Sequence, residues 1–198
     1  RVDFIWQGLI QIDAELRAQG GGLIVRFGKP TECIPQIAKE LGVNAVFTNH
    51  DYEPSAIERD LVVKEDLAGK GIRFEHFKDQ VIFEPGEIVN GSGEFYKVFT
   101  PYSKNWLEKF RTTRVQPLPT ANWSNLFQTS ALPIPTLKDM GFAPSPIEIP
   151  MNELDEEIVR HYEERRNFPA QRGTSRLGIH LRFGTLSIRK LALKAASL

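Results

Sequence analysis

Short apolar runs alternate with stretches of helical periodicity over the first 77 residues of this 198-residue chain. The runs have the length of buried strands and span residues 23–27, 44–48 and 72–77. Strands that alternate with helices at this spacing form parallel β-α-β units, because two parallel strands need a long crossover between them. Such crossovers are almost always right-handed. The pattern therefore predicts an α/β fold with a doubly wound parallel sheet.

The helices predicted around these strands cover residues 1–19, 32–41 and 53–68. Apolar residues in the first helix recur every three or four positions, which is typical of a helix with one buried face. Thr31 is the predicted cap of the second helix. Ligands of such sheets bind beyond the carboxyl ends of the strands, so the polar segment 49–51 is a candidate site region.

The pattern loosens beyond the third strand. A turn signal at residues 90–93 predicts a link between two short strands, and a helix is predicted at 103–110. Seven of the 13 prolines lie within residues 113–150, a stretch without long periodicity, which indicates an extended linker. The sequence thus divides into residues 1–112, 113–150 and 151–198.

The last part of the chain predicts one helix at residues 152–166, whose early acidic and late basic residues complement the helix dipole. A glycine- and hydroxyl-rich turn follows, in which Thr174 and Ser175 are the predicted caps of a short helix. Free N–H groups at such a turn attract anions, phosphate above all, and Arg176 adds a planar charged fork. A further helix is predicted from Ser187. The turn predicts an anion site, with a capped surface helix as the alternative.

Charge and composition limit the classes of function. The chain has 25 basic and 25 acidic residues, so no global field attracts nucleic acid, and a DNA contact needs a local patch. The single cysteine, Cys33, excludes an internal disulfide and fits a reducing cytoplasm. The four histidines lack the spacing of a zinc site, so no metal is predicted. No apolar run approaches the length of a membrane span and no signal peptide is evident, so no membrane partner is expected.

The C-terminal part resembles the start of the flavin-binding domain of DNA photolyases and cryptochromes. The resemblance is carried by Tyr162, by the Thr-Ser-Arg-Leu turn that begins twelve residues later at Thr174, and by the Phe-Gly-Thr-Leu-Ser junction at 183–187. It extends over essentially the whole chain. It implies a partial Rossmann-like antenna domain, a long interdomain linker and the first helices of an all-α FAD-binding domain in the three parts defined above. The family's first strands and most of its helical domain are missing, so we expect an N-terminal fragment.

Within the family, the chain is most like class I cyclobutane pyrimidine dimer (deoxyribodipyrimidine) photolyases. The resemblance implies light-driven repair of UV-damaged DNA, in which excited reduced FAD donates an electron to a flipped-out pyrimidine dimer. It implies FAD-binding roles for six residues: Tyr162, Thr174, Ser175, Arg176, Leu177 and Gly178. The family often has Ser at the position of Gly178. Arg166 is implied to face DNA, with a helix C-terminal cation as the alternative, and the catalytic residues are expected beyond residue 198.

Segment 49–60 resembles a motif of the family's antenna domain. Folate-binding relatives carry an Asn-Glu pair where this chain has Ser55 and Ala56, so no antenna residue is assigned. A second, antenna chromophore of unknown identity remains compatible with the resemblance. Two alternatives stay open, namely a cryptochrome-type blue-light receptor without repair activity and an isolated α/β nucleotide-binding module. The full-length protein is expected to be a cytoplasmic monomer.

Overall fold

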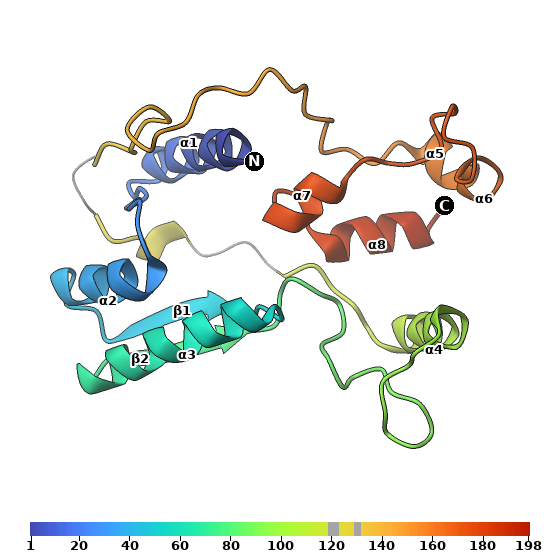
Figure 1. Ribbon diagram of the computed structural model, residues 1–198, viewed down its shortest axis with the longest axis horizontal. Coiled ribbons are helices and arrows are strands. Elements are labelled where there is room, and N and C mark those ends of the chain that lie inside the picture. Colours follow the sequence, from blue (N-terminus) through green and yellow to red (C-terminus); the bar gives the residue numbers. More distant parts are fainter. Residues whose placement is uncertain (119–122, 129–131) are drawn as a thin grey trace. The chain divides into compact units, whose positions relative to one another are not determined.

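A computed structural model describes residues 1–118, 123–128 and 132–198. The chain divides into two compact units (Figure 1). The first consists of Arg1–Phe77 and the described residues of Thr120–Ile149, and the second of Lys78–Pro119 and Pro150–Leu198. The stretch predicted to be a linker contributes residues to both units. The three ranges that the sequence predicts therefore remain a prediction.

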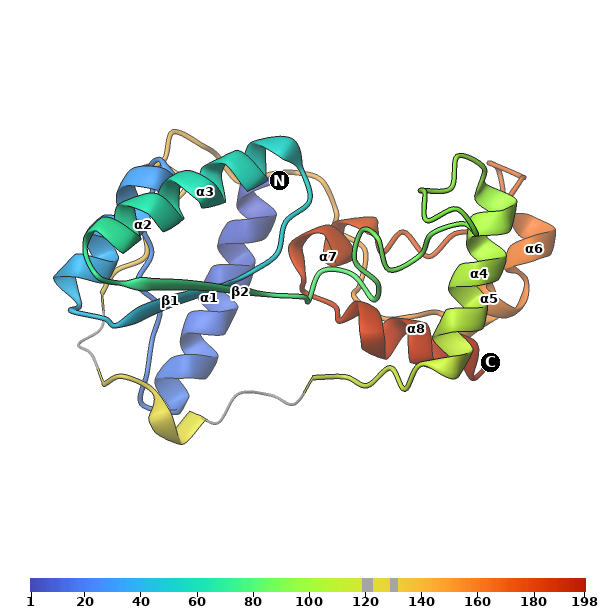
Figure 2. The ribbon, with the colours of Figure 1, turned by 90° about the horizontal axis from the view of Figure 1, so that it is seen from below.

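The first unit contains a small parallel sheet and the helices that precede and connect its strands. Its elements are α1 (Val2–Ala18), α2 (Pro30–Glu40), β1 (Ala45–Asn49), α3 (Pro54–Gly69), β2 (Arg73–Phe77) and the 3-10 turn η1 (Trp123–Asn125). β1 and β2 pair in parallel from Ala45 opposite Arg73 to Asn49 opposite Phe77. α3 is the crossover between them, as Figure 2 shows. The described residues thus form a mixed α/β fold.

One face of the sheet is covered by α2 and α3. Side chains alternate between the two faces of a strand, and Val46 and Phe74 point to the covered face. There they pack against a core of four buried residues: Ala38, Val63, Leu67 and Ile72. On the opposite face Phe47 is 65% exposed and stacks on Phe77 with ring centroids 6.2 Å apart.

The strand predicted at residues 23–27 is wrong. In the described part of the chain the sheet has the order β1-β2, and residues 23–27 are extended without a ladder. The N–H of Leu23 instead donates to Asp13 Oδ1 at 2.8 Å. An apolar run becomes a strand only beside a partner strand, so periodicity alone gave an incorrect assignment. The predicted cap Thr31 is also wrong, because α2 begins at Pro30 with Lys29 as its N-cap.

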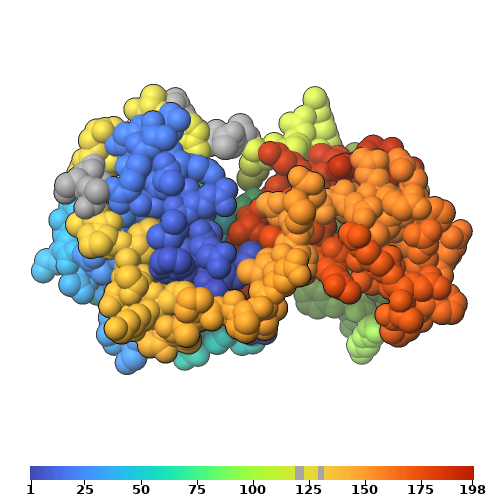
Figure 3. Space-filling model, turned by 90° about the horizontal axis from the view of Figure 1, so that it is seen from above, coloured from blue at the N-terminus to red at the C-terminus, as the bar shows by residue number. Residues whose placement is uncertain are grey.

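Residues 132–149 lie along α1 (Figure 3). The indole Nε1–H of Trp6 donates to the carbonyl oxygen of Pro135 at 3.0 Å. The N–H of Ser145 donates to Asp3 Oδ2 at 2.8 Å, and Asp3 is buried. These bonds hold a proline-rich segment with little secondary structure of its own against the first helix.

The second unit is helical. It contains α4 (Phe99–Thr112), α5 (Glu156–Arg160), α6 (Tyr162–Arg165), α7 (Gly178–Phe183) and α8 (Ile188–Ala196). The turn predicted at residues 90–93 is present, because Asn90 Oδ1 accepts from the N–H groups of Ser92 and Glu94. The two strands predicted beside it are wrong, since residues 87–98 are turns and irregular structure.

The single helix predicted at residues 152–166 is wrong, because it is divided at His161. Asp155 caps α5 by accepting from the N–H groups of Glu157 and Ile158 at 3.1 and 3.4 Å. His161 ends α5 with φ −107° and ψ 15°, outside the helical region, and α6 follows. The predicted start at Ser187 is confirmed, since its Oγ accepts from the N–H of Lys190 at 3.4 Å. Over the described residues, no helix has both the length and the apolar character needed to cross a bilayer.

Candidate functional site

The turn at residues 173–178 starts in close contact with α6. A Cβ added to Gly173 would lie 2.6 Å from the carbonyl carbon and oxygen of Arg165, so only glycine fits without moving backbone. At the other end Leu177 is 1% exposed. The turn is therefore anchored at both ends, while Thr174, Ser175 and Arg176 between them are exposed.

The backbone of Arg176 is strained. Its φ is +56°, the one positive value at a non-glycine position among the residues that the structure describes. Left-handed backbone is unfavourable for a side chain with a Cβ, and such strain often accompanies a functional site. Leu177 follows with φ −77° and ψ 2°. Successive left- and right-handed residues turn their N–H groups toward one concavity, which is a common anion-binding arrangement.

The predicted capping by Thr174 and Ser175 is wrong. α7 begins at Gly178 with Leu177 as its N-cap, and no side chain caps it. Ser175 Oγ accepts from the N–H of Leu177 at 3.5 Å instead. The left-handed Arg176 interrupts the path that would join the hydroxyl residues directly to the helix. The turn is therefore not a capped helix start, and anion binding there stays a prediction.

His180 lies in α7 and is buried, with 6% of its surface exposed. Its Nε2 lies 2.7 Å from the carbonyl oxygen of Pro150 and its Nδ1 lies 2.8 Å from Thr185 Oγ1. A carbonyl can only accept, so Nε2 carries the proton and donates it. From the sequence, His180 has no assigned role, and these two contacts tie the helix that follows the turn to Pro150 and Thr185.

The structure brings two other predicted site residues together. The guanidinium carbon of Arg166 lies 5.5 Å from the ring centroid of Tyr162, a cation–π contact beside α6. Tyr162 is 46% exposed. At Gly178 a Cβ would meet no atom within 4 Å, so the Ser that the family often has would fit there. The functional roles implied for these residues stay predictions.

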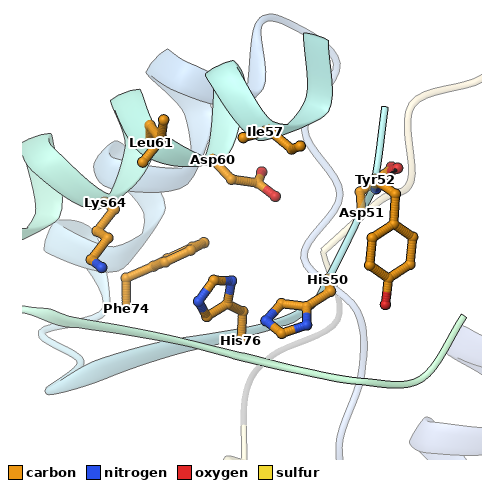
Figure 4. Close-up of a pocket in the computed structure, with 9 residues that line it drawn as sticks. All are labelled: His50, Asp51, Tyr52, Ile57, Asp60, Leu61, Lys64, Phe74 and His76. Atoms are coloured by element: carbon orange, nitrogen blue, oxygen red, sulfur yellow. Dashed lines mark hydrogen bonds between the residues drawn. The ribbon is translucent and has the colours of Figure 1, made fainter. Parts of the chain in front are cut away.

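A pocket of about 130 Å³ lies in the first unit between α3 and the ends of the strands (Figure 4). Its lining comprises nine residues: His50, Asp51, Tyr52, Ile57, Asp60, Leu61, Lys64, Phe74 and His76. The rings of His50 and His76 meet edge to face with centroids 4.2 Å apart. Asp60 points toward the two imidazoles from α3 (Figure 4).

Local bonds shape the loop that enters this pocket. Asp51 Oδ1 accepts from the N–H groups of Tyr52 and Glu53 at 2.7 and 3.2 Å, so it shapes the turn before α3. Asp51 is not the cap of α3, because Glu53 is the N-cap. Arg59 Nε donates to Asp60 Oδ1 at 2.7 Å, and this bond raises the pKa of the guanidinium.

Sequence reasoning missed the histidine pair. Thr48 lies opposite His76 in the parallel register, and the N–H of His50 donates to the carbonyl oxygen of Phe77 at 2.8 Å. His50, directly after β1, and His76, one residue before the end of β2, therefore lie close together. The sequence shows that both histidines lie near strand ends. It does not show that these two strands pair in this register, which is what brings the rings together. Over the described residues, no group of three or more His, Cys, Asp or Glu side chains is placed to hold a metal ion.

Comparison with known proteins adds independent findings. The family model described as DNA photolyase matches residues 1–122. A deoxyribodipyrimidine photo-lyase of Halobacterium salinarum is 34% identical over 96% of this chain and 42% of its own length. The chain thus spans less than half the length of this curated relative.

Solved structures share the fold. A Synechocystis cryptochrome superposes with a TM-score of 0.77 at 19% identity, over 98% of this chain and 44% of its own length. An archaeal photolyase from Sulfolobus tokodaii, described with two FAD molecules and a novel light-harvesting cofactor, gives 0.69 at 25% identity over 98% and 43%. The cryptochrome, at its low identity, supports the fold alone.

Proposed function

This chain belongs to the DNA photolyase family, and we propose from that premise that it forms part of a deoxyribodipyrimidine photolyase, a flavoenzyme that uses blue light to repair cyclobutane pyrimidine dimers. The observation that carries the proposal is the 34% identity with a deoxyribodipyrimidine photo-lyase over 96% of the chain, which includes the turn at residues 173–178. A complete α/β antenna domain with a doubly wound sheet, followed by the helical FAD-binding domain, is part of the proposal.

The turn supports FAD as the cofactor. A left-handed Arg176 followed by Leu177 at φ −77° and ψ 2° is a backbone sequence that can turn N–H groups toward a phosphate, and Arg176 is exposed beside it. Thr174, Ser175 and Gly178 would contribute hydroxyl and backbone donors to the same phosphates. Tyr162 would contact the flavin itself. When bound, the reduced and excited flavin supplies the electron that opens the cyclobutane ring and afterwards recovers it.

DNA is the proposed substrate, and Arg166 is the proposed contact. Because its guanidinium rests on the ring of Tyr162, a phosphate held by Arg166 would lie close to the proposed flavin contact. Such a contact positions the duplex without reading its sequence. A cytoplasmic location completes the proposal, since one cysteine per chain fits a reducing compartment.

The pocket beside His50 and His76 supports a second chromophore. Its volume is about 130 Å³, and His50, Phe74 and His76 contribute aromatic rings to its lining. The Sulfolobus tokodaii photolyase structure is described with two FAD molecules and the implication of a novel light-harvesting cofactor, which supports a second chromophore. We assign no identity to the ligand.

The proposed cofactor and substrate are tested by measuring flavin absorption and DNA binding of the purified complete gene product. We expect the flavin absorption bands near stoichiometric intensity and tighter binding of a dimer-containing duplex than of its undamaged twin. A colourless protein that takes up no added FAD would contradict the proposal. Bound FAD with no preference for the lesion would favour the cryptochrome alternative.

A further inference from the structure

Positive charge is concentrated on α4 and the residues that flank it. Residues 97–114 contain one acidic residue, Glu108, and five basic residues: Lys97, Lys104, Lys109, Arg111 and Arg114. The whole chain is balanced, with 25 of each sign. A local excess of this kind produces a field that the neutral chain as a whole lacks.

One face of α4 anchors the helix. The rings of Trp106 and Phe110 stack with centroids 5.1 Å apart, and Phe83 meets Trp106 edge to face at 5.5 Å. Lys109 lies on this side, where its Nζ donates to the carbonyl oxygen of Glu87 at 2.7 Å and rests 5.2 Å above Phe83. This lysine is therefore used within the unit.

The other face of α4 forms a shallow groove. Its lining consists of Lys104, Leu107, Glu108, Arg111 and Thr112, all of them exposed. Lys104 and Arg111 are seven residues apart, so they lie on the same side of the helix, about 10 Å apart along its axis. Successive phosphates of one DNA strand rise by about 3.4 Å, so two such side chains reach phosphates about three nucleotides apart.

The two cations have no carboxylate partner in the part of the chain that the structure describes. The neighbouring helices differ, since Arg160 pairs with Glu156 at 3.0 Å and Arg165 with Glu157 at 3.5 Å. Cations already paired within the protein gain less from an external anion. Lys104 and Arg111 are therefore available to pair with an anion outside the unit.

We propose that the outer face of α4 binds the phosphodiester backbone of DNA without regard to sequence, through Lys104 and Arg111. Neutralising phosphates releases the counterions condensed on the duplex, which is the main source of sequence-independent affinity. The proposal rests on the proposed function only in taking DNA as the partner. The surface is separate in sequence from Arg166 and from the turn at residues 173–178, and it acts on binding rather than on repair chemistry.

The test measures binding of an undamaged duplex to the complete gene product between 50 and 200 mM salt. The double variant Lys104→Gln with Arg111→Gln should bind on the order of tenfold more weakly at 50 mM salt, and its log–log salt slope should be shallower by about 1.8. Both residues are exposed, so circular dichroism should match that of the wild type. Glu108→Gln removes the one acid from the groove and should strengthen binding.

The control replaces two exposed cations elsewhere, Lys39→Gln with Lys138→Gln, for the same change in net charge. It should leave the salt slope unchanged. An equal loss in the control, or wild-type binding by the α4 variant, would overturn the proposal. The proposal would also be overturned if the α4 variant bound phosphatidylserine vesicles or an acidic peptide more weakly than the wild type but bound the duplex equally well. FAD content and light-driven repair are measured in separate assays. A protein that fails to repair dimers can therefore still show, in the binding assay, whether α4 contacts DNA.

Discussion

The backbone of Gly173 lies against the end of α6, where a side chain has no room. Gly173→Ala should lower the free energy of unfolding of the complete gene product by about 1–3 kcal/mol, because backbone atoms of Arg165 cannot rotate away as a side chain can. FAD affinity should fall with it, since the turn must withdraw from α6. The matched control is Gly178→Ala, where a Cβ meets no atom within 4 Å. Urea denaturation compares the two, and equal losses would contradict this packing.

Arg176 combines a strained backbone with an exposed charge. Arg176→Ala removes a charge-assisted partner worth roughly 1.5–3 kcal/mol. FAD affinity should therefore fall about tenfold to a hundredfold, since 1.4 kcal/mol is one decade. Arg176→Gly also removes the charge but relieves the left-handed strain, so it should lose similar affinity while raising the melting temperature. Fluorescence titration with FAD gives the affinity. Unchanged binding in both variants would make Arg176 a surface residue with no role in the site.

These residues show the limits of prediction from sequence. The composition of the turn, with glycine, hydroxyls and arginine, was enough to predict an anion site. It was not enough to show that Arg176 adopts a left-handed conformation, because arginine has no preference for that region. The helix start was consequently placed at Thr174 and Ser175 instead of Gly178.

At the scale of elements, α1 is tied to the segment after it through Asp13. The N–H of Leu23 and then the side chain of Arg17 hydrogen-bond to this carboxylate and lower its pKa below the ordinary value of 3.8. Its ionised form therefore stabilises the fold above that pH, and the contribution is lost as the pH falls below it. Asp13→Asn should flatten the acid limb of the stability curve below about pH 4. Glu15→Gln, on the exposed side of the same helix, should leave that limb as it is in the wild type. Acid denaturation measures both.

α8 is fastened by Arg189, which is 8% exposed. Its Nη1 donates to Asp79 Oδ1 at 2.5 Å and to the Asp79 carbonyl at 3.1 Å, and its Nη2 donates to the Lys78 carbonyl at 3.3 Å. Arg189→Lys keeps the charge but loses the fork, so it should destabilise the protein by about 2 kcal/mol. Lys190→Gln, at the exposed neighbouring position, should be neutral. If thermal unfolding gave the same melting temperature for Arg189→Lys and Lys190→Gln, the hydrogen bonds of Arg189 would contribute nothing measurable to stability.

Helices were predicted better than strands. α1, α3 and α8 follow from local periodicity and their first residues, because every backbone bond of a helix is made within it. A strand needs a partner, and residues 23–27 have none among the described residues. The break at His161 was not predicted either, because the charge pattern of residues 152–166 runs through it and gives no sign that His161 adopts φ −107° and ψ 15°.

At the scale of the whole chain, the charges balance, and this bears on the proposed DNA binding. With 25 residues of each sign, attraction must come from local surfaces, and Arg166 and the outer face of α4 are the two that we propose. The family resemblance of the sequence is confirmed by the DNA photolyase match over residues 1–122. The chain spans 42% of the length of its Halobacterium relative, so light-driven repair is a proposal for the complete gene product.

The central claim is tested most directly by light-driven repair. The complete gene product, loaded with reduced FAD, is mixed with an oligonucleotide that holds one cyclobutane thymine dimer and is illuminated with blue light. Loss of the dimer is followed by chromatography, with a dark sample and a sample lacking protein as controls. We predict that the dimer disappears with catalytic turnover in the light and persists in both controls. Persistence of the dimer under illumination, in a protein that demonstrably holds reduced FAD, would contradict the account.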